Sequence, residues 1–343
     1  MNSFCSQAYT SGGLTTLKSS KADSEFTYIL KGYPHSLKQK IITEIQNSAD
    51  CECEIAYDYN EKPVSLRCRE RNFRIVDGTY PHFNEPETYG ITDKIIDLSA
   101  FQSHEALRSR RDEAIKLFGK IRKEEKRCAG FISAAKGIAD DCRRIESPAL
   151  STSKINRFAL RLWQKHGTPP RGKVGTEKKF FADVPTENGL DFAFKRFGDM
   201  CRNIFIINDF SCAASSQLTE KMKLYALSCG FDVISFVDFL DGQTVRHIII
   251  PELEYGIYCE RAVRAPFEDA KYIRKSRFLK EEYSESCKNR ALFCKKAYNE
   301  LVNEAVKSLK NIENHKKCLE NIYISATNEK SFLINTIICI YNN

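Results

Sequence analysis

The chain has 343 residues, of which 42% are hydrophobic and 29% are charged, and its formal net charge is +8. This length is long for one domain and comfortable for two, and the composition excludes a disordered chain. No stretch approaches the roughly 20 apolar residues that a membrane helix needs, so we expect no membrane insertion.

The 14 cysteines include no pair with the Cys-x-x-Cys spacing that is typical of zinc ligands and redox motifs. The first residues carry no charged segment followed by an apolar one, as an export signal would. We therefore expect a cytoplasmic protein whose thiols are reduced and mostly pack as small core residues.

An apolar run at 26–30 ends in a turn that contains Gly32, and isoleucines recur at helical spacing from residue 41. This pattern predicts a buried strand, a turn and a helix. A second apolar strand is predicted at 72–77 and ends in an aspartate. Apolar residues at helical spacing then fill 107–145, which predicts a long helical arm.

The same order of landmarks returns after residue 178. The string Thr10–Leu14 corresponds to Thr186–Leu190, and the apolar run 26–30 corresponds to 204–207, at an offset of about 177 residues. Further strands are predicted at 232–237, 247–250 and 254–259, and a second helical arm at 279–319. This repetition predicts a tandem duplication.

We accordingly predict an α/β protein with two tandem P-loop NTPase-like domains, each a mainly parallel sheet flanked by helices and followed by a long helical arm. The domains are placed at 1–150 and 179–343. A linker at 151–178 joins them, because the segment 167–175 is rich in glycine and proline.

The segment from Gly32 to Lys38 has the strand, turn and helix context of a phosphate-binding loop. In such a loop glycines let backbone N–H groups surround a phosphate, and the lysine neutralises its charge. Gly32 and Lys38 fit these positions. Leu37 and Gln39 stand where the second glycine and the Mg²⁺-binding hydroxyl belong.

Two residues further along could complete such a site. Asp77, at the end of its strand, could act on Mg²⁺ through a bound water, and His82 could face a γ-phosphate or the attacking water. His82 could equally cap the turn at Pro81. A tight turn with a surface lysine is the alternative for the loop itself.

The second half departs further from the pattern. Asp209, Ser215 and Cys259 replace the first glycine, the lysine and the strand-end aspartate. Ser216 alone fits a nucleotide-site position, that of the hydroxyl that holds Mg²⁺. An aspartate where phosphate should enter is repulsive, so only the first half is a plausible nucleotide site.

The strings Ile29–Pro34 and Ile75–His82 in the first half, and Ile249–Leu253 in the second, resemble a family of tandem P-loop proteins of clostridial-type bacteria that are regarded as ATPases. The resemblance spans nearly the whole chain and implies ATP and Mg²⁺ as cofactors. Both phosphate loops have lost key residues of the family's Walker A motif, which puts hydrolysis of ATP in doubt.

Three functions follow as alternatives. The first is an ATPase-like protein that binds nucleotide in its first half. The second is a pseudo-ATPase scaffold that binds a protein partner through its helical arms. The third is a nucleic-acid-associated protein, because residues 271–320 hold 13 Lys and Arg against 7 Asp and Glu. The interleaved charges of this segment are equally typical of a solvated helix.

Overall fold

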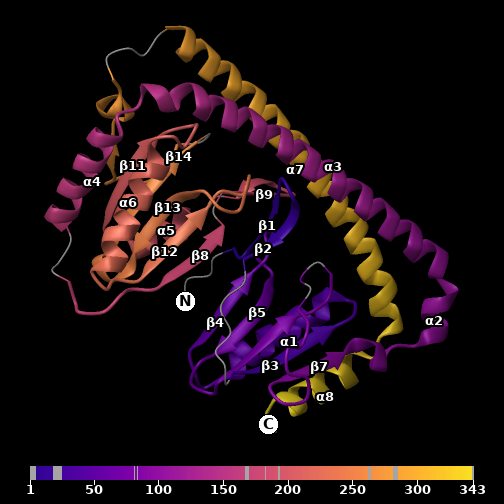
Figure 1. Ribbon diagram of the computed structural model, residues 1–343. Coiled ribbons are helices and arrows are strands. Elements are labelled where there is room, and N and C mark those ends of the chain that lie inside the picture. The colour runs from indigo at the N-terminus through magenta and orange to yellow at the C-terminus, as the bar shows by residue number, and fades with distance from the viewer. Residues whose placement is uncertain are drawn as a thin grey trace. The chain divides into compact units, whose positions relative to one another are not determined.

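The computed structural model describes residues 5–17, 25–80, 82, 84–166, 170–181, 183–191, 194–261, 264–280 and 285–341. It divides into two compact units, each with its own sheet (Figure 1). Unit 1 consists of Met1–Gln7, Lys18–Arg127 and Lys307–Asn343. Unit 2 consists of Ala8–Leu17 and Cys128–Val306.

Unit 1 is built on a five-stranded sheet in the order β4-β5-β6-β3-β7. Its strands are β3 (Phe26–Lys31), β4 (Cys53–Tyr57), β5 (Pro63–Cys68), β6 (Phe73–Asp77) and β7 (Asp93–Asp97). Strand β3 is parallel to β6 and β7, whereas the β4–β5 and β5–β6 pairs are antiparallel.

The core of unit 1 lies between this sheet and two helices, α1 (His35–Ser48) and α8 (Glu329–Tyr341). Helix α1 buries an apolar stripe at Leu37, Ile41, Ile42 and Ile45, as the spacing of its isoleucines predicts. Helix α8 packs on α1 and buries Phe332 and Ile340 in the same core. The unit also contains η1 (Leu98–Phe101) and α2 (His104–Ser109).

Unit 2 is built on a six-stranded sheet in the order β15-β11-β14-β13-β12-β8. Its strands are β8 (Glu177–Phe181), β11 (Asn203–Asn208), β12 (Val233–Val237), β13 (Val245–Ile250), β14 (Tyr255–Glu260) and β15 (Lys271–Ile273). The β12–β13 and β13–β14 pairs are antiparallel, and the other pairs are parallel.

The other elements are shorter or lie on the sheets. Two-stranded sheets are formed by β1 (Gln7–Thr10) with β2 (Gly13–Thr16) and by β9 (Val184–Thr186) with β10 (Gly189–Asp191). The remaining helices are α4 (Thr152–His166), α5 (Phe194–Met200), α6 (Ser215–Ser228), η2 (Ser147–Ala149), η3 (Pro251–Leu253) and η4 (Lys275–Phe278).

The predicted fold class, two tandem P-loop NTPase-like domains with mainly parallel sheets, is wrong. Both large sheets are mixed, because three consecutive strands in each pair antiparallel. A parallel pair requires a crossover of a dozen or more residues, usually a helix. Here only short turns join β4 to β5 and β5 to β6, so each strand must reverse direction.

The repetition in the sequence nevertheless corresponds to a repeated strand order. Strands β4-β5-β6-β3-β7 of unit 1 match β12-β13-β14-β11-β15 of unit 2, and β8 is an additional edge strand. The registers agree as well: Leu30 is paired with Asp77, and Ile207, its counterpart 177 residues later, is paired with Cys259. Asp77 and Cys259 are therefore equivalent positions.

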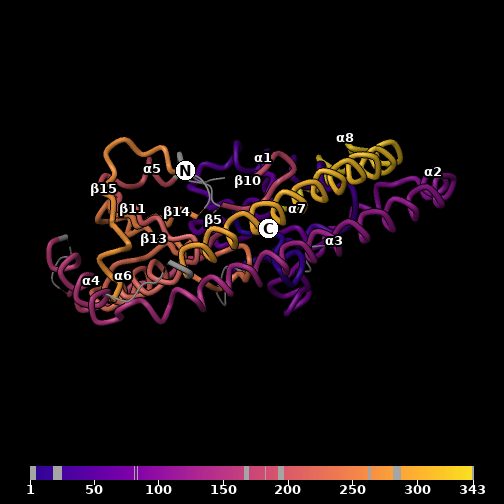
Figure 2. The backbone as a smooth tube through the Cα atoms, turned by 90° about the horizontal axis from the view of Figure 1, so that it is seen from above, coloured from indigo at the N-terminus to yellow at the C-terminus, as the bar shows by residue number. Residues whose placement is uncertain are grey.

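Two long helices, α3 (Arg111–Glu146) and α7 (Glu285–Ala326), contribute to both units. In unit 2 the second part of α3 lies beside the first part of α7, where Arg290 contacts Asp141 (Figure 2). In unit 1 the side chain of Asn311 in α7 lies within hydrogen-bonding distance of Glu124 in α3. Each predicted arm is thus one continuous helix followed by a shorter one.

The shorter helices exchange between the two halves of the chain. Helix α4, from the first half, packs on α6 in unit 2, and α8, from the second half, packs on α1 in unit 1. Isolated bridges repeat this exchange: Gln102 pairs with Thr327 in unit 1, and Leu150 pairs with Leu279 in unit 2. Both partners of one bridge are related to those of the other by 177 residues.

None of the helices in the described part of the chain has the length and apolar character that crossing a bilayer requires.

Candidate functional site at the strand ends of unit 1

The parallel strands β3 and β6 end side by side, and the predicted residues Gly32, Lys38, Asp77 and His82 gather at that edge. Leu30 of β3 is in register with Asp77, the last residue of β6. Lys38 reaches the same point from the first turn of α1. The structure therefore brings together the four site residues that were predicted in the first half of the chain.

Lys38 and Asp77 form a buried ion pair. The Nζ atom of Lys38 lies 2.6 Å from Oδ1 of Asp77, and the lysine side chain is fully buried. Burial lowers the pKa of Lys38, and the carboxylate opposes that shift. Burial alone would raise the pKa of Asp77, but the charge of Lys38 holds it well below its usual value. The lysine is thus neutralised within the protein.

Two histidines face the other oxygen of Asp77. Nδ1 of His35, the first residue of α1, lies 2.8 Å from Oδ2, and Nε2 of His82 lies 3.8 Å from the same atom. Burial lowers the pKa of His82 to about 4 despite the nearby carboxylate. Burial and the charge of Lys38 also lower the pKa of His35. Both rings are therefore neutral at pH 7.

A carboxylate from α7 occupies the N-terminus of α1. Glu320 accepts hydrogen bonds from the backbone N–H groups of His35, at 2.7 Å, and Ser36, at 3.1 Å, and from the Ser36 hydroxyl. These N–H groups and the helix dipole are what a phosphate would bind in a phosphate loop. The protein supplies that anion itself.

Gly32 closes the turn before α1. Its φ of +98° lies in the region that favours glycine, and its N–H donates to the Thr79 hydroxyl at 2.7 Å. The N–H of Thr79 in turn donates to Oδ1 of Asp77 at 2.8 Å. Gly32 and Thr79 thus hold the turn and the carboxylate in place.

Unit 2 has a different set of side chains at the equivalent edge. The positions of His35 and Asp77 are taken by Cys212 and Cys259, whose sulfur atoms lie 3.7 Å apart and are buried. Arg261 donates to Sγ of Cys212 at 3.3 Å and pairs with Asp238 through two hydrogen bonds. This edge is closed by a guanidinium and carries no lysine at the Lys38 position.

The N-terminus of α6 is also occupied by a carboxylate. Oδ2 of Asp209 accepts from the N–H groups of Ala214, at 2.8 Å, and Ser215, at 2.9 Å. Its Oδ1 lies 2.8 Å from Nζ of Lys275, which also pairs with Glu146. The aspartate that the sequence places in the phosphate position is therefore a fixed internal cap.

Ser216, predicted to hold Mg²⁺, lies in unit 2 on the first turn of α6. Its hydroxyl donates to the backbone oxygen of Cys212 at 2.5 Å. It belongs to a different unit from Lys38 and Asp77, so the predicted nucleotide residues do not form one set.

These arrangements do not fit a nucleotide phosphate with Mg²⁺. In unit 1 the lysine is neutralised by Asp77 and the helix N-terminus by Glu320. In unit 2 Asp209 fills the same place. Mg²⁺ prefers an octahedral shell of oxygen atoms, whereas the groups around Asp77 are imidazole nitrogens and an ammonium.

Sequence reasoning missed His35, Glu320, Thr79 and Gln7. Nε2 of Gln7 lies 3.2 Å from Nδ1 of His82, although 75 positions separate the residues. Glu320 lies 285 positions from His35 and carries no local signal. His35 could have been found, because it precedes the helix directly in the loop that was examined for phosphate binding.

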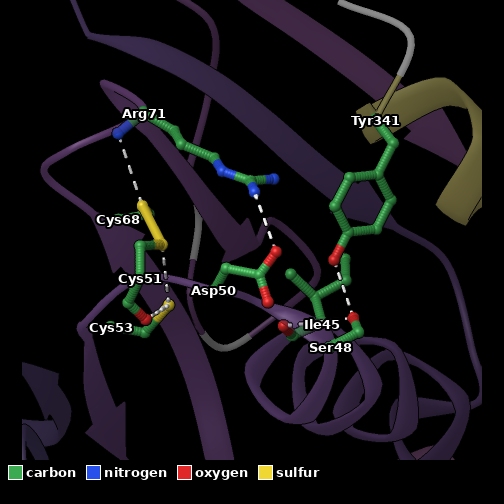
Figure 3. Close-up of a disulfide and its surroundings, with 8 residues drawn as sticks. All are labelled: Ile45, Ser48, Asp50, Cys51, Cys53, Cys68, Arg71 and Tyr341. Atoms are coloured by element: carbon green, nitrogen blue, oxygen red, sulfur yellow. Dashed lines mark hydrogen bonds and ion pairs between the residues drawn. A yellow bond between two sulfur atoms is a disulfide. The ribbon is translucent and has the colours of Figure 1, made fainter.

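A disulfide joins Cys51 and Cys68 in unit 1, a pair that the expectation of reduced thiols did not include (Figure 3). The Sγ atom of Cys53 lies 3.9 Å from that of Cys51. Antiparallel pairing of β4 with β5 sets Cys53 opposite Cys68 and brings the three sulfur atoms together.

The basic segment 271–320 is partly neutralised within the units. Lys275 pairs with Asp209 and Glu146, Arg290 with Asp141, and Lys316 with Glu313. Comparison with known proteins adds no assignment: no family model matches the chain, and no curated protein or solved structure matches it.

Proposed function

We propose that the protein is a binding scaffold that does not turn over ATP, in which internal carboxylates have replaced the phosphates of an ancestral nucleotide site. The observation that carries this proposal is that Glu320 and Asp209 cap α1 and α6 at the N–H groups a phosphate would need. A carboxylate already fixed there repels an incoming phosphate and removes its hydrogen-bond donors.

The state of Lys38 supports the same proposal. Releasing its ammonium toward a phosphate would leave the carboxylate of Asp77 buried without its cation. Separating a buried pair in this way costs about 3–5 kcal/mol. The binding energy of a nucleotide would have to offset this cost as well as the displacement of Glu320.

A scaffold requires a surface for a partner, which we expect on the long helices. Leu292 and Phe293 of α7 are adjacent and about 60% exposed. Large apolar side chains that stand together at a surface are typical of protein contacts. We place the partner contact of unit 2 at this pair.

The test compares thermal unfolding with and without millimolar Mg-ATP. We expect no shift and no release of phosphate. A nucleotide present at 100 times its Kd would stabilise the folded state by about 2.7 kcal/mol, and such a shift would contradict the proposal. A shift that disappears in Lys38→Met would in addition assign the nucleotide to unit 1.

A matched pair of variants tests the role of Glu320. Glu320→Gln removes the charge at α1 but keeps the shape of the side chain, and Glu300→Gln changes an exposed position of the same helix. We expect inorganic phosphate to stabilise Glu320→Gln more than the wild type and the Glu300→Gln control. An equal response of all three proteins would show that Glu320 does not stand in for a phosphate.

A further inference from the structure

Three potential metal ligands converge at the strand ends of unit 1. Nδ1 of His35, Oδ2 of Asp77 and Nε2 of His82 all lie within 4.8 Å of one another. They come from the start of α1, the end of β6 and the loop that follows β6. We propose that this trio binds a divalent transition metal ion of the zinc class.

The donor set matches the chemistry of such ions. Zinc is bound by imidazole nitrogen and carboxylate oxygen at about 2.0–2.2 Å, and three protein ligands leave one position of a tetrahedron open. Neighbouring ligand atoms around a tetrahedral ion are then about 3.3 Å apart. The distances from Oδ2 of Asp77, 2.8 Å to His35 and 3.8 Å to His82, lie on either side of this value.

The groups behind the ligands orient them toward a common point. Oδ1 of Asp77 is held by Nζ of Lys38 at 2.6 Å and by the N–H of Thr79 at 2.8 Å, which directs Oδ2 toward the histidines. Ligating carboxylates and histidines in metal sites are commonly held by such outer hydrogen bonds.

The partner of His82 suits the same role. The side-chain amide of Gln7 lies 3.2 Å from Nδ1 of His82. The oxygen and nitrogen of an amide have nearly the same shape, so a rotated Gln7 amide would accept a hydrogen bond from Nδ1–H. Nε2 would then present its lone pair to the ion.

The local charge also favours a cation. Asp77 and Glu320 supply two negative charges, Lys38 supplies one positive charge, and the net charge around the trio is therefore −1. Glu320 lies at the N-terminus of α1, where the helix dipole would otherwise oppose a cation. A divalent ion changes the sign of the local charge and creates no larger imbalance.

Unit 2 provides an internal comparison. The positions equivalent to His35 and Asp77 are Cys212 and Cys259, and Arg261 donates to the sulfur of Cys212. A guanidinium at hydrogen-bonding distance from a ligand atom opposes a divalent cation. We expect one ion per chain, bound in unit 1.

The experiment titrates metal-free full-length protein with Zn²⁺ by calorimetry, without reductant, so that the Cys51–Cys68 disulfide stays intact. We expect one Zn²⁺ per chain. His35→Ala and His82→Asn should each weaken binding by at least about tenfold, the smallest effect usual for groups that only support metal ligands. His104→Ala is the matched control, because His104 is exposed and also begins a helix.

A second readout does not depend on the variants folding. Addition of Co²⁺ to the wild type, labelled at its six histidines, should shift the ring resonances of two histidines strongly and leave the other four nearly unchanged. Absence of saturable Zn²⁺ binding would overturn the proposal. So would binding that His35→Ala and His82→Asn leave intact, or Co²⁺ shifts at histidines other than His35 and His82.

Discussion

The sulfur atoms of Cys212 and Cys259 lie 3.7 Å apart in unit 2, at the positions that His35 and Asp77 hold in unit 1. The register of β11 with β14 and of β3 with β6 makes these pairs equivalent. One strand edge therefore carries an imidazole and a carboxylate, and the other carries two thiols. The charges around each pair differ accordingly.

We expect the stability of unit 2 to rise with pH between about pH 6 and pH 9. The hydrogen bond with Cys259 and the charges of Arg261 and Arg246 lower the pKa of Cys212 to about 6, against its burial and the charge of Asp238. In this range the unfolded chain holds a proton that the folded unit has released. The contribution is present above the ordinary pKa of 9.0 and is lost as the pH falls through about 6, with a slope of at most about 1.4 kcal/mol per pH unit.

The fluorescence of Trp163, the one tryptophan of the sequence, measures this effect. Trp163 is buried in unit 2 against Tyr225 and Phe231. Urea unfolding at several pH values should show the slope in the wild type and lose it above pH 7 in Cys212→Ser. A variant that keeps the slope would assign it to another group.

Replacing Lys38 by methionine should destabilise unit 1 by about 3–5 kcal/mol, because Asp77 is then buried without its cation. The double variant Lys38→Met/Asp77→Leu should recover part of this loss. Lys40→Met is the control in the same helix: its pair with Glu329 is exposed and should contribute less than about 1 kcal/mol. Urea unfolding followed by far-ultraviolet circular dichroism measures all three variants, and equal losses for Lys38 and Lys40 would contradict the prediction.

Local patterns in the sequence predicted most of the elements correctly. The apolar run at 26–30 is β3, the runs at 204–207 and 254–259 are β11 and β14, and the helical spacing at 107–145 falls largely in α3. Such runs are decided by which side chains must leave water, which neighbouring residues determine. The repeat offset also gave the equivalence of the two strand orders.

Strand direction and the composition of the site could not be predicted in the same way. Residues 50–70 are polar, so β4 and β5 gave weak signals, and with them the antiparallel pairs of unit 1 were lost. Gly32, Lys38 and Asp77 could be found because they belong to one local pattern. Glu320 and Gln7 could not, because only the exchange of helices and the closure of the chain bring them to the site.

The exchanged helix α8 should be required for the stability of unit 1. Phe332 is fully buried and meets the ring of Phe101 at 5.6 Å between centroids. Phe332→Ala should destabilise the unit by about 3–5 kcal/mol, as for other buried phenylalanines. Ile334, two positions later, is 49% exposed, so Ile334→Ala should change stability by less than about 1 kcal/mol. Similar losses for the two variants would show that α8 does not pack on α1 as described.

The disulfide between Cys51 and Cys68 should stabilise unit 1 by about 3 kcal/mol, because it closes a loop of 17 positions and restricts the unfolded chain. Dithiothreitol should lower the urea midpoint of the wild type and leave that of Cys51→Ser unchanged. Cys318→Ser, at an exposed position of α7, is the control and should respond to the reductant as the wild type does. If the reductant lowered the midpoint of Cys51→Ser as much as that of the wild type, the stabilisation would come from other cysteines. Mass spectrometry of alkylated peptides, which distinguishes bonded from reduced cysteines, would then identify them.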